Sequence, residues 1–582
     1  MISTNNNQYP RKMFYALALA ALMITAGCAG YTPFTPPELP PVDSLTVEQP
    51  QSNRLKSDGT DFIDQQIINQ GEQSIDLGRQ FRWLMGCPKE ALNVNAFDEV
   101  QNSSWFTNRL SLQSVSGSKT AVNYDLWSKP NITQPLTVLK AIHHGGTVRL
   151  IIEDSRGDRY ELKFDPVGCN GLHRGAEMIG ATALAAAGYN VPEVSICFVH
   201  PHLLKVSEQS ELLDDKGKAH PMSEADLAGV LAEIELQHNG LLRCVASKAI
   251  AGSSLGHFQF EGIRKDDPND LVPHQHRREL RGLYVISSWL NFTDVKASGT
   301  MDSFVKGSGR PLVKHYLTNF DAILGSGGAG AQPVYRGYEN DFDPAALATR
   351  IFSLGMYNPA WEHVPAEVQY PCIGRFHSAY FQPDKFKPSI PNPAFNNLTP
   401  RDGFWGAKIV MAFRDDDIRS LVGLANYPDS AAEDYLTKTL IERRDKIGEY
   451  WFNKLSPLDD FVLKDNGGGL QELHFDDLAI RYGLADEATT VYRCALKLNG
   501  QKVSVFPGLR GRDVVSGERV LQLPDPSELA FRMMTRSEPV QQWEVSLTVK
   551  RVDGDWLPPV KIYLEVTPES GKHRIIGLHR EN

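Results

Sequence analysis

The sequence lacks the features that would place it in several common functional classes. Its 582 residues contain no long basic run, and the formal net charge is −10, which argues against a nucleic-acid partner. None of the seven cysteines has Cys-x-x-Cys spacing, so a zinc site is not expected. No Ser-His-Asp or zinc-protease constellation indicates a hydrolase. Beyond the N-terminal segment, no stretch reaches the roughly 18 apolar residues of a membrane-spanning helix.

The composition is that of a globular protein. Apolar residues make up 41% of the chain and charged residues 22%, so general disorder is not expected. A chain of 582 residues predicts two to four domains. The cysteines after the first have spacings that leave disulfide bonds and buried free thiols equally open: Cys87, Cys169, Cys197, Cys244, Cys372 and Cys494.

Residues 1–28 are typical of a lipoprotein signal peptide. Two basic residues precede an apolar run, Met13 to Ala26, which is too short to span a bilayer as a mature helix. The run leads into Ala-Gly-Cys, which is similar to a bacterial lipobox, and its cysteine is Cys28. Thr25 stands where Leu, Val or Ile is usual, and an ordinary secretory signal is the alternative.

The residues that follow predict the location of the protein. Ala29, rather than Asp, comes after the cysteine, and in a Gram-negative host lipoprotein sorting rules then imply the outer membrane. Acyl chains on Cys28 would make the membrane a partner through a lipid anchor. The proline-rich residues 29–50 favour an extended tether that lifts the folded part off the membrane, with simple disorder as the alternative.

The chain is organised around the stretch from Trp289 to Ser326, which begins at the end of an apolar helix. An apolar helix is predicted first, and a polar loop then holds Asp294 and Lys296 two residues apart. A hairpin with a Gly-Ser-Gly turn follows and runs into Asn319-Phe320-Asp321. This order of parts is that of a protein-kinase catalytic core, and solvated loop charges on a helix and hairpin are the alternative. The predicted elements are a helix at Glu279–Leu290 and strands at Ser303–Lys306 and Leu312–Leu317.

A strand and a helix before this stretch carry a second pair of charges. Residues 136–165 predict three strands, and the alternation of the third puts Lys163 opposite its apolar side chains. A helix at His173–Ala187 holds Glu177 in its predicted first turn, 14 residues after the lysine. Kinases use such a lysine and glutamate to contact nucleotide phosphates, whereas a surface salt bridge worth little is the alternative.

The rest of the sequence, after the stretch around Asp294, predicts a helical part followed by a β domain. Helices are expected at Pro344–Leu354, Asp402–Asn426 and Asp429–Lys454. From about residue 487 the apolar period changes to two, and Asn499-Gly500 predicts a hairpin turn between strands Val491–Leu498 and Lys502–Phe506. Residues 457–486 are expected to be a packed linker.

Several strings resemble a family of uncharacterised exported bacterial lipoproteins. They include NSSWFTNR, RGDRYELKFDP, VKHYLTNFDAILGS and ERRDKIGEYWF, and the resemblance covers most of residues 95–456. The order of motifs is similar to that of atypical kinases of the HipA-like and spore-coat CotH-like kinds. The fold class that this implies is α+β, with a two-lobed protein-kinase-like domain followed by a small, sandwich-like antiparallel β domain. The expected parts are an N-terminal extension at 51–135, an N-lobe at 136–255, a mostly helical C-lobe at 256–456, and a linker with the β domain at 457–582.

The resemblance also implies roles for individual residues. Lys163 would contact phosphates, with Glu177 as its helix partner. Asp294 would be the catalytic-loop base, and Lys296 would steady the transferred phosphoryl group. ATP and magnesium are the cofactors that this resemblance implies.

The sequence departs from the kinase pattern at the metal ligands. Gly299 stands where the catalytic-loop asparagine is expected, five residues after Asp294. The metal-binding acid of Asp-Phe-Gly is replaced by Asn319, an amide without charge. Asp321, Asp302 or Ser298 could compensate through a shift in register. The candidate metal ligands are Asn319 and Asp321.

Three functions remain open. The first is a pseudoenzyme that binds a small-molecule ligand or an envelope protein, because the metal ligands are degenerate and a bacterial envelope contains little ATP. The second is an active atypical kinase with Asp294 as base. The third is a structural envelope lipoprotein whose β domain binds another envelope component.

Overall fold

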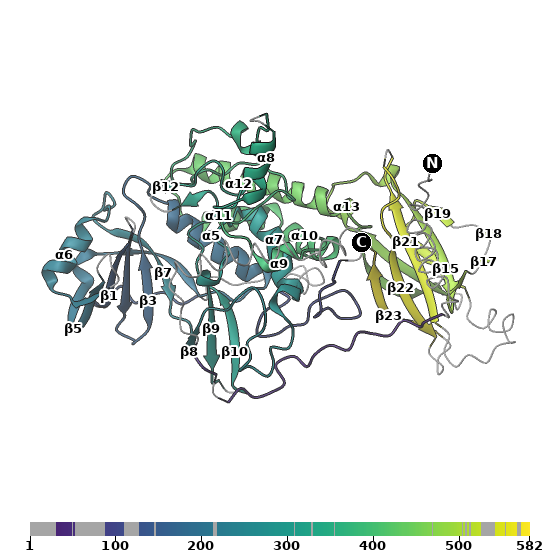
Figure 1. Cartoon of the computed structure of the whole chain (residues 1–582), viewed down its shortest axis with the longest axis horizontal. Helices are drawn as coiled ribbons and strands as arrows, with labels where there is room; N and C mark the ends of the chain where they lie inside the picture. The colour runs from purple at the N-terminus through teal and green to yellow at the C-terminus, as the bar shows by residue number, and fades with distance from the viewer. Residues whose placement is uncertain are drawn as a thin grey trace, which may run out of the picture. The chain divides into compact units, whose positions relative to one another are not determined.

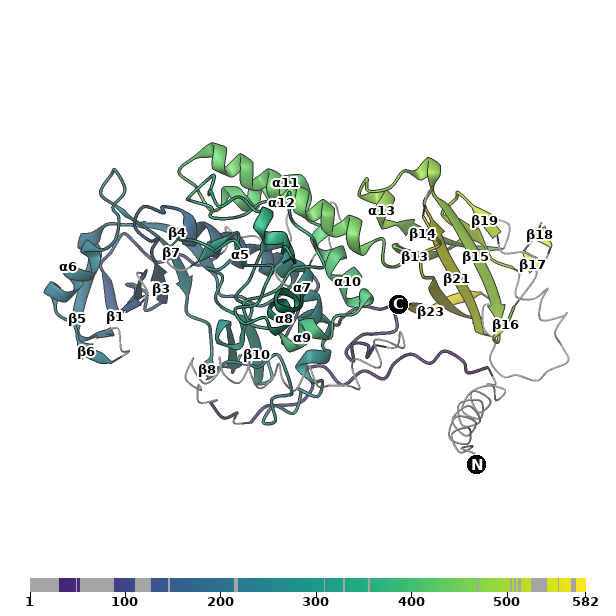
Figure 2. The same ribbon diagram turned by 45° about the horizontal axis from the view of Figure 1, so that its top comes forward.

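The computed structural model describes most of the chain (Figures 1 and 2). The described residues are 31–48, 50–52, 88–109, 127–144, 147–213, 218–307, 309–327, 330–353, 356–467, 470–502, 505–506, 509–510, 514–524, 542–552, 554–566 and 572–581. The predicted signal peptide with Cys28 lies outside them. The chain divides into a β unit, comprising Met1–Pro36, Asp459–Asp476 and Ala488–His579, and a main unit, comprising Pro37–Leu458, Asp477–Glu487 and Arg580–Asn582.

The β unit confirms the antiparallel sheets that were predicted near the C-terminus. One sheet has the order β13-β14-β20, and another has β16-β15-β21-β22-β23 with β19 beside β15. Asn499 and Gly500 have φ angles of 45° and 75°, as the predicted turn requires. The strands are β13 (Leu458–Asp465), β14 (Gln471–Asp477), β15 (Val491–Leu498), β16 (Gln501–Lys502), β17 (Val505–Phe506), β18 (Leu509–Arg510), β19 (Val514–Ser516), β20 (Val520–Gln522), β21 (Gln542–Lys550), β22 (Val560–Val566) and β23 (His573–Arg580).

Three details of this unit differ from the sequence prediction. The stretch expected to be a linker contains strands β13 and β14. Strand β14 lies between β13 and β20 and pairs with both. The strand expected at Lys502–Phe506 is split between β16 and β17, and β17 pairs with β18 instead. The start of the proline-rich tether is packed, because the Phe34 ring stacks on Tyr563 with centroids 4.1 Å apart. These contacts join residues far apart in sequence, which local patterns do not reveal.

The main unit contains the three strands predicted at 136–165, within a seven-stranded sheet of order β4-β7-β3-β2-β1-β5-β6. Its pairings are antiparallel except for β1 with β5, which is parallel. Alternate apolar side chains such as Leu150, Tyr160 and Leu162 form a buried core on one face. The strands are β1 (Leu136–His144), β2 (Thr147–Glu153), β3 (Arg159–Lys163), β4 (Val194–Val199), β5 (Leu204–Leu213), β6 (Ala219–Pro221) and β7 (Leu242–Lys248).

Helices dominate the rest of the main unit (Figure 2). The predicted helix before the Asp294 loop is α7, and it packs against α9, α10 and α12 with Trp289 fully buried. The helix expected at Asp402–Asn426 is two helices, because the chain breaks at residues 412–414 and Arg414 begins a new capped helix. The described helices are α5 (Leu172–Ala187), α6 (Glu224–Ala232), α7 (Arg278–Leu290), α8 (Pro344–Phe352), α9 (Pro393–Asn396), α10 (Pro400–Met411), α11 (Asp415–Gly423), α12 (Ser430–Trp451) and α13 (Leu478–Arg481).

A smaller sheet, β10-β9-β8, pairs the hairpin after the Asp294 loop with a strand that precedes α7 in the chain. It consists of β8 (Ser253–Gly256), β9 (Thr300–Val305) and β10 (Leu312–Leu317), so the predicted hairpin is confirmed by the antiparallel pairing of β9 with β10. The remaining short strands, β11 (Ser326–Gly327) and β12 (Gly330–Ala331), pair with each other. The five described cysteines are free thiols, and Cys197, Cys244 and Cys494 are buried, whereas Cys169 and Cys372 are partly exposed.

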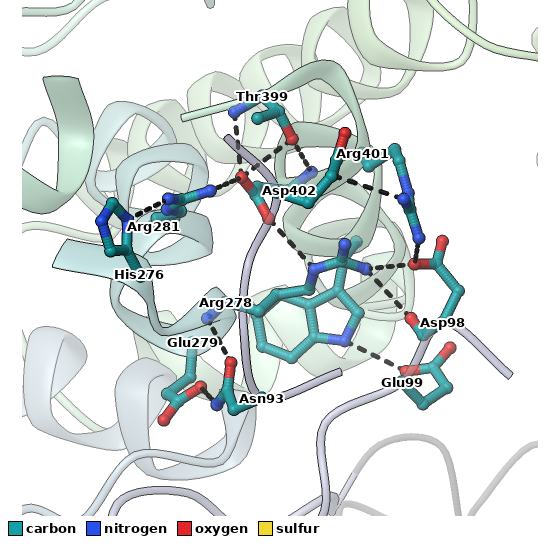
Figure 3. Close-up of polar contacts among 12 residues, drawn as sticks. Asn93, Asp98, Glu99, His276, Arg278, Glu279, Arg281, Thr399, Arg401 and Asp402 are labelled. Carbon is teal, nitrogen blue, oxygen red and sulfur yellow. Dashed lines mark hydrogen bonds and ion pairs between the residues drawn. The ribbon is translucent and has the colours of Figure 1, made fainter. Parts of the chain in front are cut away.

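A buried charge network holds the described part of the N-terminal extension against α7 and α10 (Figure 3). Arg278 donates from Nη1 to Asp98 Oδ1 at 2.8 Å and from Nε to Asp402 Oδ1 at 3.0 Å. Arg281 Nη1 lies 3.1 Å from Asp402 Oδ2, and Arg401 Nη2 lies 2.6 Å from Asp98 Oδ1. Because α7 leads directly into the Asp294 loop, this network fixes the helix on which the candidate site depends.

Candidate functional site

Lys163 and Glu177 form the ion pair that the sequence predicts. Lys163 Nζ lies 3.0 Å from Glu177 Oε1, and their side chains are 12% and 1% exposed. Lys163 ends β3 on the face opposite the buried Tyr160 and Leu162, as the alternation of the strand requires. The predicted position of Glu177 in the first helical turn is wrong: α5 begins at Leu172 and has no acidic residue in its first turn. Glu177 therefore lies in the second turn.

The side chain of Asp165, whose role was not predicted from the sequence, sets the start of α5. Its carboxylate accepts hydrogen bonds from the backbone N–H groups of Gly171 at 2.5 Å and His173 at 2.9 Å. It also accepts from Arg174 Nε at 2.7 Å. Asp165 follows Lys163 by two residues and precedes a proline, and this was the signal available in the sequence. These bonds join the end of β3 to the start of α5, so that Glu177 faces Lys163.

The Asn319-Phe320-Asp321 segment lies against α5. The backbone N–H of Phe320 donates to Glu177 Oε2 at 3.3 Å. Gly180 permits this close approach, because a Cβ there would lie 2.5 Å from Ile323 Cδ1 and 2.9 Å from Phe320 Cβ. Glu177 therefore binds both the lysine of the sheet and the backbone of this segment.

Charges around Lys163 keep it protonated. Burial alone would lower the pKa of Lys163, but the carboxylates of Glu177, Glu161 and Asp321 outweigh burial and raise it. Burial raises the pKa of Glu177, and the charge of Asp321 raises it further against the opposing effect of Lys163. Lys163 pairs with Glu177, and the charge of Asp321 acts on both members of this ion pair.

The Asp294 loop meets the same segment. Lys296 Nζ lies 3.1 Å from Asp294 Oδ1. Burial raises the pKa of Asp294; Lys296 opposes this shift, and Asp321 adds to it. A Cβ built on Gly299 would lie 3.6 Å from the carbonyl oxygen of Asp294 and 3.8 Å from Asn319 Cβ. The structure therefore brings the sequence-predicted site residues into one neighbourhood.

The candidate metal ligands are only partly in place. Asp302 is engaged by Arg264 at 3.0 Å and by His315 at 2.7 Å, so it is not available in this site. Asp321 and Asn319 remain as side-chain oxygen donors, and Gly299 contributes none. In the part of the chain that the structure describes, no group of three or more His, Cys, Asp or Glu side chains is arranged to hold a metal ion.

Comparison with known proteins gives one distant resemblance to report. No protein-family model and no curated protein matches the chain. Among solved structures, the crystal structure of the Golgi casein kinase with Mn/ADP bound is similar over 71% of this chain and 96% of that chain, with 8% identity and a TM-score of 0.26. The match is distant, so the case for a kinase-like arrangement rests on the geometry of the described residues.

Proposed function

We propose that the main unit is a kinase-like binding module that holds a phosphate-bearing ligand, such as a nucleotide, at Lys163 and does not transfer its phosphoryl group. The observation that carries this proposal is the buried Lys163–Glu177 pair, with Phe320 N–H bonded to the same glutamate. An ammonium group has three donors, and Glu177 occupies one of them. The others are suited to phosphate oxygens, because hydrogen bonds between charged groups are strong.

Transfer requires more than this lysine. Kinases neutralise the charge of the transferred group with magnesium held by an aspartate and an asparagine. Asp321 and Asn319 would supply two oxygen ligands here, and bound magnesium would neutralise phosphate charge, but Gly299 provides no side chain. Loss of one ligand removes part of the electrostatic stabilisation on which phosphoryl transfer depends.

An active atypical kinase is the second candidate, and Asp321 favours it. The charge of Asp321 raises the pKa of both Lys163 and Asp294. As a metal ligand, this carboxylate would supply the negative charge that the amide of Asn319 does not. The raised pKa of Asp294 also suits a group that accepts a proton from a substrate hydroxyl.

Titration with ATP, with and without magnesium, distinguishes these candidates. We expect weak binding, with a Kd on the order of 0.1–1 mM or about −4 to −5.5 kcal/mol, that magnesium does not strengthen. Incubation with labelled ATP should leave no phosphate on the protein, with magnesium or with manganese. Incorporation that Asp294→Ala abolishes would establish the kinase instead, and Asp321→Ala would then test the substitute metal ligand.

The proposal also places the protein in the bacterial envelope, anchored through Cys28. Among the described residues, no helix is long and apolar enough to cross a membrane. Cys28→Ala is expected to move the protein from the membrane fraction to the soluble envelope fraction, because the acyl chains would be lost. Mass spectrometry of the wild-type N-terminus provides the control. A wild-type protein that is soluble and carries no acyl group would rule out the anchor.

A further inference from the structure

A pocket that is partly open to solvent lies next to the Asp294 loop. Asn291, three residues before Asp294, forms part of its wall. Gln332, also in the wall, donates from Nε2 to Thr293 Oγ1 at 3.0 Å. Neither Lys163 nor Glu177 lines the pocket, so it is separate from the proposed phosphate site.

The ionisable side chains that line the pocket are mostly basic, and none is acidic. Five basic residues face the pocket, and no aspartate or glutamate does: Arg336, Arg375, His377, Lys385 and Arg443. Two of them have acidic partners outside the lining. Arg336 pairs with Asp341 at 2.6 Å, and Lys385 pairs with Asp384 at 3.1 Å.

Arg443 has no such partner among the described residues. Its side chain, on α12, is buried. Nε donates to the carbonyl oxygen of Trp289 and Nη1 to that of His377, both at 2.8 Å, and Nη2 donates to that of Ser288. The rings of Phe381 and Phe376 lie 3.7 Å and 4.5 Å from its guanidinium carbon. Burial lowers the pKa of Arg443 to about 9. A buried charge with only neutral acceptors is costly, which points to a counter-ion from outside the chain.

Arg375 is in a similar position. It donates to the carbonyl oxygens of Gln332, at 2.7 Å, and Ala366, and no carboxylate of the described residues lies within ion-pair distance. Arg375 Nε and His377 Nδ1 are buried without a hydrogen-bond partner in the described structure. Burial lowers the pKa of His377 to about 4, and the charges of Arg443, Arg375 and Lys446 contribute to the shift. The pocket thus combines a positive field with an unsatisfied donor, Arg375 Nε.

We propose that this pocket binds the phosphate group of a small phosphate monoester. Two guanidinium groups without acidic partners, Arg375 and Arg443, match the charge of about −1.5 to −2 on such a group. The unpaired Arg375 Nε is suited to its oxygens, and Phe381, Phe386 and Tyr338 offer apolar surface to its organic part. The proposal does not depend on nucleotide binding at Lys163.

Isothermal titration with inorganic phosphate tests this site, with acetate as a monoanionic comparison. Wild type should bind phosphate more tightly than acetate, and Arg375→Gln should weaken phosphate binding at least about tenfold, because a charge-assisted bond is lost. Lys385→Gln, at an exposed position, is a second variant that should weaken phosphate binding without disturbing the fold.

Arg419→Gln is the matched control, because Arg419 is 67% exposed on α11 and pairs with a surface aspartate. It should bind phosphate as wild type does. The proposal is overturned if wild type binds no phosphate, if acetate binds as tightly, or if Arg375→Gln and Lys385→Gln both leave phosphate affinity unchanged in folded protein.

Discussion

Arg278→Met is expected to lower the free energy of unfolding by about 3–5 kcal/mol, because removing one partner of a buried ion pair leaves uncompensated charge in the interior. Arg278 contacts both Asp98 and Asp402, and all three side chains are buried (Figure 3). Methionine has a similar length and restores packing, but it supplies neither donors nor charge. Equilibrium unfolding in urea measures the difference.

The control for this variant is Arg419→Met. Arg419 is also paired with an aspartate, at 3.2 Å, but both side chains are exposed, so a change within about 0.5 kcal/mol is expected. A loss of less than about 1 kcal/mol in Arg278→Met would contradict the assignment of the network as the anchor of the N-terminal extension.

The same network predicts how stability depends on pH. Burial alone would raise the pKa of Asp98, but Arg278, Arg401 and Arg580 lower it well below its usual range. A carboxyl group with a lowered folded-state pKa stabilises the fold above its unfolded pKa of about 3.9, and this contribution is lost as pH falls further. The stability difference between wild type and Arg278→Met should therefore shrink below about pH 4.

Lys163→Met is expected to weaken nucleotide binding by about 10- to 100-fold. A hydrogen bond between charged groups is worth about 1.5–3 kcal/mol, and about 1.4 kcal/mol corresponds to a factor of ten. Titration calorimetry with ATP measures the change. Lys163→Arg keeps the charge and should retain more of the affinity than methionine does.

Removal of Lys163 also leaves the buried Glu177 without its cation, so loss of binding must be separated from loss of structure. The double variant Lys163→Met/Glu177→Gln removes both charges and retains an acceptor for the Phe320 N–H. It should fold with the circular dichroism of wild type and still fail to bind ATP. Wild-type affinity in a folded Lys163 variant would refute the role of the lysine.

The sequence predicted the parts of the site that depend on local periodicity. The alternation of β3 placed Lys163 opposite the buried face, and the apolar helix after it placed Glu177 nearby. The exact start of α5 was missed because Asp165 fixes it through side-chain contacts to Gly171 and His173. Such a cap depends on the fold around it and has no periodic signal.

Features that depend on contacts between distant segments of the chain could not be predicted from local sequence patterns. Strand β14 pairs with β20, more than 40 residues away, so its segment resembles a polar linker when considered alone. The charges of α7 resemble a solvated helix face, yet Arg278 and Arg281 are buried against residues from distant segments. The basic pocket likewise combines residues from 291 to 443, which no local motif joins.

The most direct test of the central claim is to find where a nucleotide contacts the chain. An acyl-phosphate derivative of ATP transfers its acyl group to lysines beside the bound phosphates, and peptide mapping by mass spectrometry identifies them. Our account predicts acylation of Lys163, reduced by excess ATP and absent in Lys163→Arg. Labelling that leaves Lys163 unmodified, or that excess ATP does not reduce, would contradict it.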